Sequence, residues 1–269
     1  MSEATPRRPD AAPNPNQEPQ PLAQINPVRA QVRLSERTPF VVYALLGLTV
    51  AVYLLQMATA DPRLVAANVA CGDQAACFGM KINDLILAGQ WWRFITPVLL
   101  HASLLHIGFN MYALYILGPE LERHFGHIPF LILYLLSGFA GVVLSFLLTE
   151  SPSLGASTAV FGLLGAQGVF VYRNQKLFGR RAQAMLRSIL NIAVINLLIG
   201  LSPGIDNWGH VGGLLGGGLF AWIAAPFYAL EGDGVELKLV NHTKSERTWL
   251  AAFVVSAIFL ALASVKFWT

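Results

Sequence analysis

The chain has 269 residues, of which 55% are hydrophobic and only 12% charged. An average soluble domain carries about 25% charged residues. This composition excludes a disordered chain, a disulfide-stapled mini-protein and a soluble globular domain, and it favours a membrane protein. The net charge of +3 does not indicate nucleic-acid binding, because basic residues in a membrane protein set its topology.

The first part of the chain, residues 1–37, is rich in Pro, Asn and Gln and has no long apolar run. Such a composition is typical of a disordered segment. It also lacks the apolar core of a cleavable signal peptide. We expect a disordered, Pro-rich tail in the cytosol.

Seven apolar segments without Asp, Glu, Lys or Arg follow the tail. They cover residues 40–57, 98–117, 128–148, 155–172, 188–201, 208–228 and 249–265. Most are close to the roughly 20 residues that a helix needs to cross a bilayer, and the short fifth one is expected to use flanking residues. Because a helix satisfies its own backbone hydrogen bonds in lipid, we predict an all-α polytopic membrane protein.

The basic residues predict the orientation of these spans. With the N-terminus inside, 14 of the 18 Lys and Arg residues fall on the inner side. The positive-inside rule therefore places the N-terminus in the cytosol and the C-terminus outside. Residues 229–248 become a charged cytosolic linker, and residues 249–269 carry the seventh transmembrane helix.

The first outside loop contains both cysteines of the chain, Cys71 and Cys77. In an oxidising compartment they could form a small disulfide loop. Two unpaired thiols are the alternative, and the spacing does not decide between them.

Polar residues stand out in spans that lack charge. The second span holds His101, His106 and Asn110, the fourth begins near Ser157, and the sixth begins near His210. His106 and Asn110 are four residues apart and share one helix face. All three spans run from outside to inside, so these polar groups meet in the outer part of the membrane. Ionisable groups at that depth are candidates for function.

The grouping suggests nucleophilic catalysis. A serine hydroxyl needs a base, and His210 can take the proton of Ser157. An oxyanion formed there could be stabilised by the N–H groups at the helix start and by His106 and Asn110. The spans contain no carboxylate, so a dyad is the simpler arrangement, with Asp206 at the rim as the weaker candidate for a third member.

Glycines favour a close approach of the fourth and sixth spans. Gly213 and Gly217 share a helix face with His210, and small residues let helix backbones approach in lipid. Ordinary packing in a membrane bundle explains the same pattern when it is considered alone.

At these positions the sequence resembles the rhomboid family of intramembrane serine proteases, from about Phe40 to Tyr228. The matching motifs are Trp92-Arg93, the set His101, His106 and Asn110, the run Gly155-Ala156-Ser157, and His210-x-x-Gly213-x-x-x-Gly217. The resemblance implies a six-helix rhomboid-like bundle over residues 38–228 with one additional C-terminal transmembrane helix. Thr158 departs from the glycine that the family has after its nucleophile, but it keeps the backbone N–H.

The resemblance also implies roles. Ser157 is expected to be the nucleophile and His210 the general base. The Ser157 N–H, His106 and Asn110 are expected to form the oxyanion hole. No cofactor or metal is implied.

Further positions are expected to support the site. Phe161 is expected against the catalytic histidine, while His101, Arg93 and Trp92 are expected to hold the second span and the first loop. The implied substrates are single-pass transmembrane proteins. We expect the plasma membrane of a prokaryote rather than an organelle membrane, and the oligomeric state stays open.

Other functions remain as alternatives. A catalytically inactive rhomboid-like chaperone or adaptor should lack the nucleophile or the base, and this chain has both. A channel or transporter favours carboxylates inside the membrane. A metal held by His101, His106 and His210 is disfavoured, because the five-residue spacing of the first two puts them on different helix faces.

Overall fold

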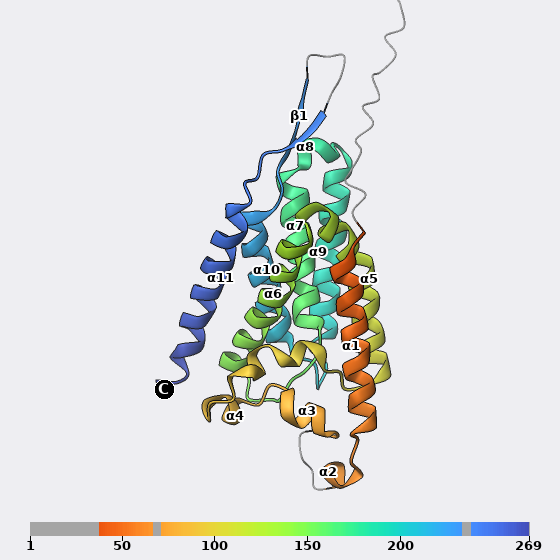
Figure 1. Cartoon of the computed structure of the whole chain (residues 1–269), viewed down its shortest axis with the longest axis vertical. Helices are drawn as coiled ribbons and strands as arrows, with labels where there is room; N and C mark the ends of the chain where they lie inside the picture. Colours follow the sequence, from red (N-terminus) through yellow and green to blue (C-terminus); the bar gives the residue numbers. More distant parts are fainter. Residues whose placement is uncertain (1–37, 67–70, 233–237, 269) are drawn as a thin grey trace, which may run out of the picture. The chain divides into compact units, whose positions relative to one another are not determined.

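The computed structural model describes residues 38–66, 71–232 and 238–268 (Figure 1). The predicted tail, residues 1–37, lies outside the described residues. Within the described part, seven long helices cover the seven predicted segments. They are α1 (Phe40–Ala58), α5 (Leu104–Phe125), α6 (His127–Leu148), α7 (Ser157–Arg173), α9 (Arg181–Ile199), α10 (Asn207–Ala224) and α11 (Glu246–Val265). The prediction of an all-α polytopic membrane protein is confirmed.

Short elements fill the connections. Between α1 and α5 lie α2 (Pro62–Ala66), α3 (Gln74–Gly79), α4 (Asn83–Leu87) and the 3-10 helices η1 (Trp91–Phe94) and η2 (Thr96–Leu99). The helix α8 (Gln175–Phe178) follows α7. Two short strands, β1 (Tyr228–Glu231) and β2 (Lys238–Asn241), pair antiparallel. The predicted sixth span ran to residue 228, but α10 ends at Ala224, and β1 begins at Tyr228 and continues into the segment expected to be a linker. This hairpin lies at the end of the bundle opposite to α3 and α4 (Figure 1).

The helix bounds differ from the predicted spans where polar residues act as caps. The second span was predicted from residue 98, but α5 begins at Leu104 because the Ser103 side chain accepts the His106 N–H at 3.2 Å. His101 therefore precedes the helix. At its other end α5 continues to Phe125 and includes charged residues. The fifth span was predicted from residue 188, whereas α9 begins at Arg181.

Four helices in the described part are long and apolar enough to cross a membrane by length and composition alone: α1, α6, α9 and α11. The other three long helices carry the candidate functional residues. Helix α7 has only 17 residues, and histidine, asparagine and glycine make α5 and α10 less apolar. In α5 and α10 the polar residues and glycines thus weaken the membrane signal, whereas α7 is too short.

Helix α7 lies in the middle of the bundle, in contact with α5, α6, α9 and α10. Figure 1 shows α10 beside α6 and α7, with α11 packed on the outer side of α6 and α10. Glycines set the spacing of α7 and α10. A Cβ at Gly213 would collide with the carbonyl of Thr158, and one at Gly217 with the backbone of Gly162. Only glycine allows these backbones to approach so closely.

Lys81 is a buried cation that fixes the end of α6. Its Nζ donates to the carbonyl oxygens of Ser145 (3.3 Å), Thr149 (2.8 Å) and Ser151 (3.0 Å). The last carbonyls of a helix lack partners within the helix and attract positive charge. Burial lowers the pKa of Lys81 to about 8. Lys81 is one of the four basic residues that the predicted topology places outside, and its ammonium group is enclosed by the fold.

A buried carboxylate holds the start of α1. Glu122, near the end of α5, accepts the N–H groups of Val41 at 2.9 Å and Val42 at 2.8 Å. The first N–H groups of a helix lack partners within the helix and favour a negative charge. The contact is possible because α1 and α5 pack closely, and a Cβ at Gly118 would lie 2.7 Å from a Val42 methyl.

Candidate active site

Ser157 is the first residue of α7 and is half-buried. The turn before it depends on Gly155, whose φ of +136° disfavours any residue with a side chain. The Gly155 N–H donates to the Pro97 carbonyl at 2.9 Å, which ties the turn to η2. Ser157 is therefore presented by a fixed turn at a helix N-terminus.

His210 reaches this serine from α10. Its Nε2 lies 2.9 Å from the Ser157 Oγ, and the residue is only 8% exposed. Phe161, one turn after Ser157, stacks on the imidazole with ring centroids 4.3 Å apart and 5° between the planes. The structure thus brings together Ser157 and His210, which the sequence grouped by depth, and Phe161, which the resemblance placed against the histidine.

Asp206 caps α10 and does not complete a triad. Its Oδ1 accepts the Gly209 N–H at 2.9 Å. The Nδ1 of His210 is buried and has no hydrogen-bond partner among the described residues. The geometry therefore pairs His210 with the serine alone.

His106 lies against the nucleophile turn. A Cβ built on Gly155 would lie 2.7 Å from His106 Nε2 and 3.6 Å from Ser157 Oγ, so the ring occupies the space left by the missing side chain. The Nδ1 of His106 accepts the Ala102 N–H at 3.4 Å. A neutral ring that accepts at Nδ1 carries its proton on Nε2, the atom that faces the turn.

Asn110 is buried one turn further along α5. Its Nδ2 donates to the His106 carbonyl at 3.0 Å, which occupies one of its two amide hydrogens. The second hydrogen remains for another acceptor. This hydrogen bond runs along α5, so Asn110 is linked to the site through His106.

Thr158, the residue after Ser157, is accommodated in the packing between α6 and α10. Its side chain is buried, and a Cβ built on Gly141 of α6 would lie 2.5 Å from the Thr158 Cβ. The opposing face of α10 is open at Gly209, where a Cβ would lie 3.0 Å from the Thr158 Cγ2. Two glycines thus make room for the larger residue.

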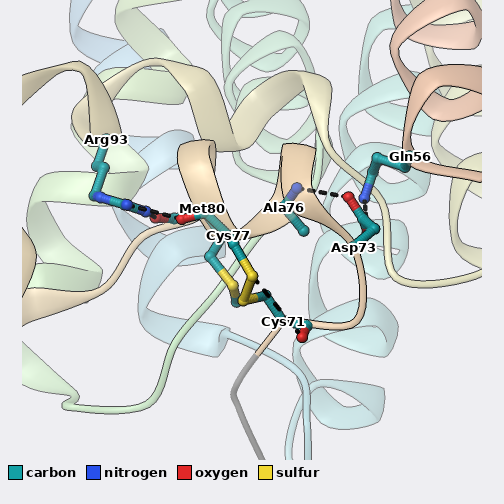
Figure 2. The surroundings of a disulfide bond; sticks show 7 residues. All are labelled: Gln56, Cys71, Asp73, Ala76, Cys77, Met80 and Arg93. Carbon is teal, nitrogen blue, oxygen red and sulfur yellow. Dashed lines mark hydrogen bonds between the residues drawn. A yellow bond between two sulfur atoms is a disulfide. The ribbon is translucent and has the colours of Figure 1, made fainter. Parts of the chain in front are cut away.

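Trp92 and Arg93 hold the first outside loop. Arg93 is buried and donates to the carbonyls of Met80 at 2.7 Å and Cys77 at 2.8 Å (Figure 2). The Trp92 indole N–H donates to the Phe78 carbonyl at 2.9 Å. Both residues therefore bind the end of α3 and do not contact Ser157 directly.

A disulfide joins Cys71 and Cys77 on the same loop (Figure 2). It closes a small ring around the start of α3. The sequence left this pairing open.

The structure also reveals polar residues that the sequence reasoning missed. Gln56 and Glu122 are buried and make hydrogen bonds to distant backbone groups. Their polarity at the ends of apolar segments could have pointed to them. Gln56 lies at the end of the first apolar segment, and Glu122 lies just after the second, between Gly118 and Gly126. Among the described residues, no group of three His, Cys, Asp or Glu side chains is placed to hold a metal ion.

Comparison with known proteins identifies the family. A family model for the Rhomboid domain matches residues 88–227. The rhomboid protease GluP of Bacillus subtilis is 44% identical over 141 residues, which cover 52% of this chain and 27% of that protein. RHOMBOID-like protein 2 of Arabidopsis thaliana is 37% identical over 180 residues, which cover 64% of this chain and 55% of the relative.

A third relative, the chloroplastic RHOMBOID-like protein 9 of Arabidopsis thaliana, is 32% identical over 160 residues, or 59% of this chain and 37% of the relative. The chain thus spans only part of the length of each of these proteins. The matched region contains every residue of the site from Trp92 to Gly217. The chain belongs to the rhomboid family.

Proposed function

We propose that this chain is an intramembrane serine endopeptidase that cleaves single-pass transmembrane proteins in or near their membrane span through a Ser157–His210 dyad. The distance of 2.9 Å between Ser157 Oγ and His210 Nε2 carries the proposal. It is within hydrogen-bond range and pairs a nucleophile with a base. The similarity to a relative named a protease supports the same activity.

In the proposed reaction His210 removes the Ser157 proton as Oγ attacks the scissile carbonyl. The tetrahedral intermediate collapses when His210 gives that proton to the leaving amine, which yields an acyl-enzyme. Water then attacks the ester while His210 takes its proton, and His210 returns that proton to Ser157 Oγ as the ester bond breaks and the carboxylic acid product leaves. The half-buried serine, near the outer ends of α7 and α10, suits this need for water.

The oxyanion is stabilised by donors on the α5 side of Ser157. Ser157 begins α7, where backbone N–H groups lack helical partners and the helix dipole favours negative charge. His106 adds Nε2–H next to Gly155, and Asn110 supplies its remaining amide hydrogen. Removal of one such donor costs about 100- to 1,000-fold in kcat in other serine proteases. For Asn110→Ala we expect a loss of 10- to 1,000-fold on the same basis.

The proposed topology has the N-terminus in the cytosol and the C-terminus outside, in the plasma membrane of a prokaryote. It follows from the distribution of Lys and Arg. In this orientation the loop with the Cys71–Cys77 disulfide lies outside the cytosol, where disulfides persist. The site then opens toward the outer leaflet.

Cleavage of a tagged single-pass substrate in proteoliposomes tests the activity. We expect Ser157→Ala and His210→Ala each to lower kcat by at least about 1,000-fold. Ser264→Ala and His242→Ala are matched controls, because these residues lie at the end of α11 and in the hairpin region. Full cleavage by Ser157→Ala would disprove the mechanism. An inactive wild type would favour the chaperone or adaptor.

A further inference from the structure

We propose that Gln56 and Asp73 are positioning residues of this active site, which hold the His101 backbone and thereby the oxyanion side of Ser157. The inference rests on the proposed function. It assigns a task to two polar residues that lie outside the motifs of the site. It also explains why the disulfide loop is built beside α1.

The side-chain amide of Gln56 makes two hydrogen bonds to the backbone of His101. Its Oε1 accepts the His101 N–H at 2.9 Å, and its Nε2 donates to the His101 carbonyl at 3.2 Å. The side chain is buried in the last turn of a membrane-spanning helix. A buried amide is costly unless it is hydrogen-bonded, so the pairing is strongly held.

Asp73 orients this amide. Its Oδ2 accepts from Gln56 Nε2 at 3.1 Å, and its Oδ1 accepts the Ala76 N–H at 2.7 Å at the start of α3 (Figure 2). A carboxylate only accepts hydrogen bonds, so the nitrogen of Gln56 must point toward Asp73. The oxygen of Gln56 is then left for the His101 N–H.

Asp73 is itself fixed on the loop. It lies inside the ring closed by Cys71 and Cys77, and Arg93 binds the carbonyl of Cys77 (Figure 2). The Asp73 carboxylate therefore has little freedom to follow a movement of α1. The hydrogen bond to this carboxylate therefore holds the Gln56 amide in one orientation.

His101 transmits this position to the active site. Its Nε2 accepts the N–H of Ala156, the residue before the nucleophile, at 3.4 Å. Its ring packs edge-to-face on His106 with centroids 5.0 Å apart. One backbone position thus supports both the turn that presents Ser157 and the ring that donates toward it. A shift of His101 would move both, and oxyanion stabilisation is sensitive to such shifts.

The test compares kinetic constants of full-length variants in proteoliposomes. Active molecules are counted with a fluorophosphonate serine probe, and thermal stability is measured in parallel. We expect Gln56→Leu to lower kcat about 10- to 100-fold and to leave KM nearly unchanged. This loss in kcat is no larger than the loss expected when a direct oxyanion donor is removed. A purely structural role would lower stability and leave kcat per active molecule alone.

Asn174→Leu is the matched control. Asn174 is also a buried amide, and it donates to the carbonyls of Phe170 and Pro226 at the other end of α7. Its loss is expected to lower stability to a similar degree and to keep kcat per active molecule within about twofold. The comparison separates positioning from general stabilisation.

Exchanging the amide of Gln56 and the carboxylate of Asp73 between the two positions is expected to recover part of the lost kcat. Gln56→Glu alone places two carboxylates together, and Asp73→Asn alone lets a donor face the Gln56 nitrogen. The pair Gln56→Glu with Asp73→Asn restores a donor and an acceptor between the side chains and keeps an acceptor for the His101 N–H, while the hydrogen bond to the His101 carbonyl is lost. We expect each single variant to lose kcat and the pair to recover about half of the loss in activation free energy.

The proposal is overturned if Gln56→Leu retains the kcat of Asn174→Leu, or if the paired variant is no better than its parents. Should Gln56→Leu fail to fold, Asp73→Asn and the paired variant decide the question. A wild type that neither cleaves substrate nor takes up the probe contradicts the proposed function itself, which is a different result from a defect confined to Gln56 and Asp73.

Discussion

The imidazole of His210 lies flat on the ring of Phe161, with centroids 4.3 Å apart and 5° between the planes. The contact fixes the plane of the ring whose Nε2 faces Ser157. When His210 takes up the serine proton it becomes a cation, and the face of an aromatic ring stabilises a cation. The stacking thus supports the charged state that the proposed reaction requires.

We therefore expect Phe161→Leu to lower kcat about 2- to 10-fold, in line with an aromatic pair of about 0.5–1.5 kcal/mol. Phe170→Leu, a buried phenylalanine on the same helix, is the control and should affect stability more than kcat. Equal kcat in the two variants would show that the stacking has no part in catalysis.

The close approach of α7 and α10 predicts the effect of added methyl groups. In Gly213→Ala the new Cβ would meet the Thr158 carbonyl, so the helices must separate. We expect a loss of about 1–3 kcal/mol of stability, together with loss of activity as His210 moves from Ser157. Thermal unfolding and cleavage assays measure both.

Gly218→Ala is the control for this experiment. A Cβ at Gly218 meets nothing within 4 Å among the described residues. Alanine is the better helix former, so stability should stay the same or rise slightly. If Gly213→Ala behaves like Gly218→Ala, close helix approach does not determine the geometry of the site.

The hydrogen bonds of Asp206 predict a modest role in catalysis. Asp206→Asn keeps a side-chain acceptor for the Gly209 N–H, so the cap of α10 is retained. We expect kcat to fall less than about tenfold. In a triad protease the corresponding change costs about 10,000-fold. A loss of that size would show that His210 depends on Asp206.

The disulfide should contribute measurably to stability. Cross-linking Cys71 to Cys77 closes a ring of seven residues, for which the chain-entropy model gives about 2 kcal/mol. The double variant Cys71→Ser/Cys77→Ser and the reduced wild type should therefore melt at a similarly lowered temperature. Unchanged melting of the wild type in reductant, with the bond shown to be open, would contradict this.

Much of the fold could be predicted from the positions of charge. A charged side chain is costly in lipid, so its absence marks the seven long helices. The start of α5 was less predictable, because it is set by a local hydrogen bond from the His106 N–H to the Ser103 side chain. The short helices between α1 and α5 lack a periodic pattern and were not predicted.

The grouping of Ser157, His106 and His210 followed from depth and helix spacing, which the sequence contains. The hydrogen-bond partners of Gln56, Glu122 and Lys81 could not be predicted in this way, because they are mainly backbone groups 45 or more residues away in the sequence. A backbone carbonyl looks the same at every position of a sequence. Such contacts emerge only when the packing of the helices is known.

The proposed nucleophile is tested most directly by covalent labelling. The purified wild type, Ser157→Ala and His210→Ala are treated with a fluorophosphonate probe, and the modified residue is identified by mass spectrometry. We predict labelling of the wild type on Ser157, none in Ser157→Ala, and strongly reduced labelling in His210→Ala. Equal labelling of the wild type and Ser157→Ala, or modification at another serine, would contradict the proposed mechanism.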